Sequence, residues 1–99
     1  MASLYVSEYE GLGQLGGRFL PGVSEPSLAT HVVAIGGASA QSPAFSTGTH
    51  LVRVHADANC SLKFGQNPTA STADLRTVAG FTEYFAVSPG DKVAVIANA

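Results

Sequence analysis

Several side chains of this 99-residue chain are of types that bind metal ions, namely three histidines and one cysteine. His55 and Asp57 are two positions apart, so on an extended strand they share a face, whereas His50 and His55 would not. No His-x-His or Cys-x-x-Cys pair adds ligands, and a zinc site needs three or four. The spacing therefore predicts no metal site, and it places His55 on the surface of a strand and His50 in a loop.

A glycine motif, Gly11-Leu12-Gly13-Gln14-Leu15-Gly16, matches the G-x-G-x-x-G pattern of dinucleotide-binding sites. That pattern binds a pyrophosphate only where a strand leads into a helix. The residues that follow, 18–22, read RFLPG, and their proline and glycine cannot sustain such a helix. We therefore expect no nucleotide cofactor here.

The candidates for nucleophilic or acid–base catalysis are equally weak. Cys60 alternates with apolar residues along a short run, a pattern typical of a small buried hydrophobe. Glu83 shares a strand face with Phe81 and Phe85, so its side chain could be partly buried. An edge position, or pairing with Arg53 or Arg76 of another subunit, is the favoured interpretation. No Ser/His/Asp arrangement stands out. The sequence predicts no catalytic residue, and we expect that the protein is not an enzyme.

The elements that would position these residues are short strands, because β-rich runs are repeatedly interrupted by Gly, Pro, Asn and Ser. The run 31–35 is apolar on both faces, which is typical of a central or sandwiched strand. The runs 81–87 and 92–97 flank a turn, Ser88-Pro89-Gly90-Asp91, and predict a hairpin or sandwich corner that is mostly core. The full set of predicted strands is 4–6, 31–35, 51–56, 60–64, 81–87 and 92–97, with weaker candidates at 44–47 and 75–78.

These six to eight short strands predict an all-β fold, a single compact β-sandwich domain of jelly-roll-like form that spans residues 1–99. The stretch 11–30 is rich in glycine and proline and predicts a long loop or a Gly-rich N-terminal arm.

Charge is scarce along the chain. Charged residues make up 12% of it, about half of the ~25% usual for globular domains, and none lies between Glu25 and Arg53. Burying an uncharged surface costs little desolvation free energy, so this composition favours packing against other proteins. The net charge of −2 and the five scattered basic residues argue against binding to nucleic acid or to an anionic membrane. The first residues show no secretory signal.

The eight aromatic residues allow a second interpretation. Compact β-sandwiches often carry a sugar-stacking face, so a carbohydrate-binding module is the alternative, and it predicts a cluster of exposed tyrosines.

Five segments of the chain carry a resemblance to small structural proteins of tailed bacteriophages: LYVSEY at 4–9, VAIGG at 33–37, LVRVHADANCS at 51–61, EYFAV at 83–87 and KVAVI at 92–96. The chain resembles their head-decoration, or cement, proteins. The resemblance implies a protein made in the host cytoplasm that binds the major capsid protein on the outside of the assembled head, stabilises the shell and forms a homo-oligomer. It implies no catalytic, cofactor or metal-binding residues. A head–tail or tail-fibre component is a further alternative.

We expect intersubunit contacts from the strand 4–6, from the arm and from the uncharged middle segment. Deletion of residues 1–25 is expected to abolish capsid binding and leave a folded domain. The predicted interface residues are Leu4, Tyr5, Val6, Tyr9, Leu12, Leu15, Arg18, Phe19 and Leu20.

Overall fold

The structure is a computed structural model that describes residues 2–15, 17–23 and 25–99. The described residues form strands and no helix, so no helix that could cross a membrane is found among them. The strands are β1 (Ser3–Tyr9), β2 (Leu12–Leu15), β3 (Arg18–Val23), β4 (Ala29–Ala34), β5 (Ala40–Gln41), β6 (Leu51–Ala56), β7 (Cys60–Gly65), β8 (Leu75–Thr77), β9 (Thr82–Ala86) and β10 (Lys92–Ala97).

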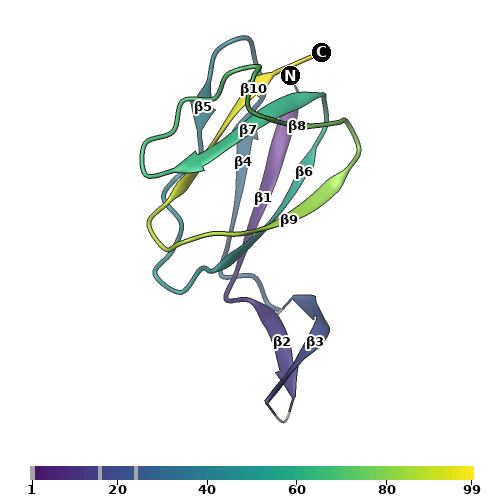
Figure 1. Cartoon of the computed structure of the whole chain (residues 1–99), viewed down its shortest axis with the longest axis vertical. Coiled ribbons are helices and arrows are strands. Elements are labelled where there is room, and N and C mark those ends of the chain that lie inside the picture. Colours follow the sequence, from purple (N-terminus) through teal and green to yellow (C-terminus); the bar gives the residue numbers. More distant parts are fainter. Residues whose placement is uncertain (1, 16, 24) are drawn as a thin grey trace.

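Eight of the strands build a sandwich of two antiparallel sheets, one in the order β4-β1-β6-β9 and the other in the order β5-β10-β7-β8 (Figure 1). Within the sandwich, all connections except β1 to β4 and β7 to β8 pass from one sheet to the other. This crossing pattern is the jelly-roll type of arrangement. The prediction of an all-β sandwich is confirmed.

On β6 the core follows from alternation along the strand, whereas β7 and β10 each bury three consecutive residues. On β6, Val52, Val54 and Ala56 are buried while the residues between them are partly exposed, as expected for a strand with one face on the core. The rings of Phe64 and Phe85, one from each sheet, close the gap with centroids 5.0 Å apart. The buried core cluster consists of Leu4, Val6, Val33, Ile35, Phe45, Val52, Val54, Ala56, Cys60, Leu62, Val93 and Val95.

Two strand predictions need correction. Residues 31–34 of the run 31–35 belong to β4, which is an edge strand of its sheet and not a central one, and its Val32 is 64% exposed. The inner positions of this sheet are held by β1, which lies between β4 and β6, and by β6, which lies between β1 and β9. The weak candidate at 44–47 is not a strand.

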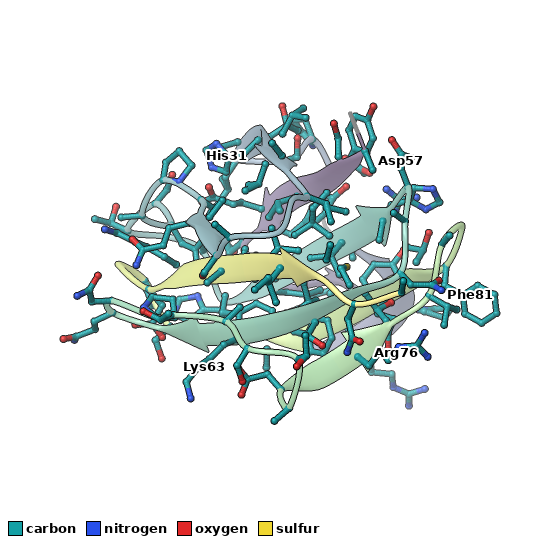
Figure 2. The ribbon with its side chains drawn as sticks, turned by 90° about the horizontal axis from the view of Figure 1, so that it is seen from above. His31, Asp57, Lys63, Arg76 and Phe81 are labelled. Carbon is teal, nitrogen blue, oxygen red and sulfur yellow. The ribbon has the colours of Figure 1, made fainter. Side chains whose placement is uncertain are left out.

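The segments 81–87 and 92–97 form a sandwich corner and not a hairpin, since β9 and β10 belong to different sheets. The prediction that both are mostly core is right for β10 and wrong for β9, which is an edge strand. Phe81 precedes β9 and projects outward from the sandwich (Figure 2).

Within the stretch 11–30, β2 and β3 form the arm, which is a β-hairpin rather than a loop, and residues 29 and 30 begin β4. β2 and β3 pair as an antiparallel hairpin, and Gly17, with φ of 79°, supplies the left-handed backbone that its turn requires. Figure 1 shows the hairpin extending away from the sandwich, which lengthens the molecule to 46 × 25 × 21 Å.

Candidate functional site

The surface with the richest mixture of side chains is the side of the sheet β4-β1-β6-β9 that faces away from the core, which we call the outer face. Strand alternation directs Tyr5, Val32, Arg53, His55 and Tyr84 onto it. Tyr5 stands between Val32 on one neighbouring strand and His55 on the other, and Arg53 faces Tyr84. The outer face therefore combines aromatic, aliphatic and cationic groups at adjacent positions.

The first hollow on the outer face has a volume of about 400 Å³. It is lined by residues 5–7 of β1, residues 30–32 of β4, and Arg53 and His55 of β6. The His55 ring is held in place by a hydrogen bond between Nδ1 and Oγ1 of Thr82, at 2.9 Å. This hollow is shallow and mainly apolar, with basic groups along one wall.

A second hollow, of about 210 Å³, lies where the arm meets the outer face. The arm contributes Leu12 and residues 21–23, and the sheet contributes Leu51 and Tyr84. Leu12 and Tyr84 are both exposed although they are large and apolar, as are Tyr5 and Val32 in the first hollow. The two hollows thus gather four of the large apolar side chains that the sandwich leaves open to solvent.

The sandwich also contains a buried carboxylate that the sequence analysis missed. Glu8 follows Leu4 and Val6 on the inward face of β1 and is fully buried. Its Oε1 accepts hydrogen bonds from the Thr49 hydroxyl and from the Ser46 backbone N–H, each at 2.7 Å, and its Oε2 contacts Nε2 of His31. The inward alternation of residues 4, 6 and 8 was the signal that could have identified it.

The environment of Glu8 keeps it ionised. Burial by itself raises the pKa of this carboxyl, but the hydrogen bonds from Ser46 and Thr49, together with His31, outweigh burial and leave the pKa below its ordinary value. The Glu8 side chain is fully buried beneath the sheet, so its carboxylate is not accessible to a substrate from solvent. We interpret the Glu8–His31 pair as a clip that fastens the edge strand β4 and the segment 46–49 to β1.

A second polar contact lies at the root of the arm. The hydroxyl of Tyr9 donates a hydrogen bond to the Glu25 carboxylate at 3.2 Å, which joins the end of β1 to the segment that follows the arm. Burial and the neighbouring Glu25 raise the pKa of Tyr9. The contact orients the arm relative to the sheet.

The predicted interface residues fall into three groups. Leu4, Val6 and Tyr9 are buried, so they hold the fold together and do not offer side chains to a neighbour. By contrast, Tyr5, Leu12 and Arg18 are exposed and available for contact. The side chains of Leu15, Phe19 and Leu20 lie outside the part of the chain that the structure describes.

The remaining chemical candidates do not converge. Among the described residues, no three His, Cys, Asp or Glu side chains lie close enough to hold a metal ion. Cys60 is fully buried, and burial raises the pKa of its thiol, with a smaller effect from Glu83. Comparison of the chain with protein-family models, with curated proteins and with solved structures finds no match. The function therefore has to be inferred from the outer face and the arm.

Proposed function

We propose that the protein is a structural component of a tailed-bacteriophage head, a decoration or cement protein that binds the capsid protein on the outside of the assembled shell. The observation that carries this proposal is the outer face, where two neighbouring hollows expose Tyr5, Val32, Leu12 and Tyr84. Exposed apolar side chains grouped around hollows mark interaction surfaces.

The energetics favour a partner that offers many copies of its binding site. Complete burial of one large apolar side chain contributes about 1.5–3 kcal/mol, and these four are already partly covered. Association costs about 4–15 kcal/mol in lost translational and rotational freedom. One copy alone would therefore bind weakly, whereas linked copies on a repeating shell would gain avidity.

The projecting arm supports the same proposal. It adds a second wall to the outer face, at Leu12 and residues 21–23. A hairpin that stands away from the sandwich can reach the subunit beside the one on which the sandwich sits. Bridging neighbouring subunits is how a decoration protein would stabilise a shell.

The test is co-sedimentation of the purified protein with heads assembled from the capsid protein encoded in the same genome. We expect saturable binding that is weakened at least tenfold by Tyr5→Ser. The matched control is Leu75→Ser, because Leu75 on β8 of the other sheet is exposed to the same degree (46%, against 44% for Tyr5). Equal binding by both variants, no binding by the wild type, or a genome without a capsid gene would refute the proposal.

A second candidate function is supported by a specific observation. Tyr5 and Tyr84 are both exposed on the outer face, beside Arg53 and His55, and aromatic rings next to polar groups can bind sugars. A glycan screen with the free protein tests this alternative. Binding that disappears in both Tyr5→Ala and Tyr84→Ala would favour a carbohydrate-binding module, and a screen without hits would reject it.

A further inference from the structure

β4 is an edge strand of the sheet β4-β1-β6-β9, and some of its backbone N–H and C=O groups point away from the sheet. Within the described residues, β4 pairs with β1 alone. The Ile35 N–H donates to the Ala2 carbonyl, so the hydrogen-bonded pairs of this ladder alternate from there and include Val33 opposite Leu4. It follows that Thr30, Val32 and Ala34 direct their N–H and C=O groups away from β1.

The side chains of the same three residues are exposed. Val32 is the one large apolar residue among them, and it is 64% exposed. Among the described residues, the backbone groups that Thr30, Val32 and Ala34 direct away from β1 form no hydrogen bond with another segment. β4 thus presents an open strand edge of six residues.

The other sheet margins are protected in the ways that natural proteins use against edge-to-edge pairing. β9 carries the inward-facing charge of Glu83, β8 is three residues long and carries Arg76, and β5 is only two residues long. β4 has no lysine, proline, carboxylate or bulge, and its His31 is turned inward to the clip with Glu8. Its regular register and its fastening to β1 make it a rigid template for another strand.

We propose that β4 pairs antiparallel with β4 of a second copy. This pairing joins the sheet β4-β1-β6-β9 of one copy to the same sheet of the other, and it forms one continuous sheet across a two-fold axis. Placing Val32 opposite the partner's Val32 sets Thr30 opposite the partner's Ala34. That register uses all three outward-directed residues and forms about six backbone hydrogen bonds, two for each facing pair.

The absence of charged residues on this edge favours a second copy of the chain as the pairing partner. Close to a two-fold axis a residue lies near its own equivalent, so a charge at the centre of this edge would face a like charge. The segment between Glu25 and Arg53, which contains the whole of β4, has no formal charge. In addition, Val32 and Tyr5 lie beside the edge on the outer face, so pairing brings the first hollow of each copy next to that of its partner.

The dimer does not depend on the proposed head binding, since it would form in solution without capsids. The test is sedimentation equilibrium of the full chain over roughly 1–300 μM, where we expect a concentration-dependent dimer. Val32→Pro should be monomeric at all these concentrations. It removes an N–H that points away from β1, and proline is tolerated at such edge positions, so circular dichroism and urea unfolding should show a folded domain.

The matched control is Tyr84→Pro on the opposite edge. The hydrogen bonds Ala56 N–H to Phe81 C=O and Val87 N–H to His50 C=O set the ladder between β6 and β9, so Tyr84 also directs its N–H away from its neighbour. Tyr84→Pro should dimerise like the wild type. A monomeric wild type, or equal dimerisation of the two proline variants, would overturn the proposal.

A second measurement covers the case in which the proline variant does not fold. A nitroxide label on Val32→Cys should show strong dipolar broadening, because facing strand residues have Cα atoms about 5.5 Å apart. The same label on Tyr84→Cys should not. The native Cys60 is buried and does not compete for the label. Equal spectra for the two labelled variants would contradict pairing through β4.

Discussion

Glu8 on β1 and His31 on β4 bring a carboxylate oxygen and an imidazole nitrogen into direct contact on the core-facing side of the sheet β4-β1-β6-β9. The other oxygen of the same carboxylate holds the hydroxyl of Thr49 and the backbone of Ser46. One fully buried charge therefore joins a central strand, an edge strand and the segment leading to β6. Its hydrogen bonds offset the desolvation that burial imposes.

Glu8→Gln should lower the free energy of unfolding by about 2–4 kcal/mol, because a buried ionic group loses its charge and one of its acceptor oxygens becomes a donor. Urea denaturation followed by circular dichroism measures the change. Glu10→Gln is the control, since Glu10 lies just past β1 and is exposed, and it should change the free energy by less than about 0.5 kcal/mol. Equal effects of the two variants would show that the clip is not stabilising.

The lowered pKa of Glu8 predicts a pH dependence. A carboxyl whose pKa is lower in the folded than in the unfolded chain contributes stability above its unfolded value, and this contribution is lost as the pH falls through the folded value. With an ordinary value of 4.5, the loss should begin below about pH 4.5. The difference in unfolding free energy between wild type and Glu8→Gln, measured from pH 7 to pH 3, should shrink across that range. A constant difference would contradict the lowered pKa.

Cys60 should be unreactive in the folded protein. Its side chain is fully buried and burial raises the pKa of the thiol, so little thiolate is present and no reagent reaches it. Titration with a thiol reagent at pH 7.5 should give no fast reaction, and full reaction once urea unfolds the chain. Rapid modification without denaturant would show that β7 opens readily.

Replacing the arm, residues 11–24, with a short glycine-asparagine turn should leave the sandwich folded and remove head binding. β1 and β4 are neighbours in the sheet, so a tight turn can join them directly. The expectation that deletion of residues 1–25 leaves a folded domain needs correction: this larger deletion should unfold the domain, because it removes the inner strand β1 with the buried Leu4 and Val6. Co-sedimentation and thermal unfolding measure both effects. An unfolded short-turn variant would mean that the arm is part of the core structure.

The local features of the fold were predictable where alternation is clean. The strand 51–56 coincides with β6, and 60–64 with most of β7, since apolar residues recur at every second position there. Partnering was not predictable in the same way. The assignment of β9 and β10 to different sheets, and the edge position of β4, depend on contacts between segments far apart in the sequence.

The candidate site illustrates the same limit. Tyr5 and Leu12 could be selected from the sequence as contact residues, but Val32, Arg53 and Tyr84 could not be joined to them, because only the sheet register brings them onto one face. The clip was hidden for a similar reason. Glu8 and His31 are 23 residues apart, and the carboxylate is stabilised by Ser46 and Thr49, which are farther still along the chain.

The positions of β1 and β10 have a consequence for the order of folding during synthesis. Of the described strands, β1 is synthesised first and lies between β4 and β6, and β10 is synthesised last and lies between β5 and β7. Neither sheet can close around its inner strand until distant segments have been made, and such non-local pairing is slow. During synthesis, β1 with Leu4 and Val6 therefore lacks its neighbour β6 until residues 51–56 have been made. The sandwich is completed only when β10 enters, so folding of this domain is a late and nearly all-or-none event.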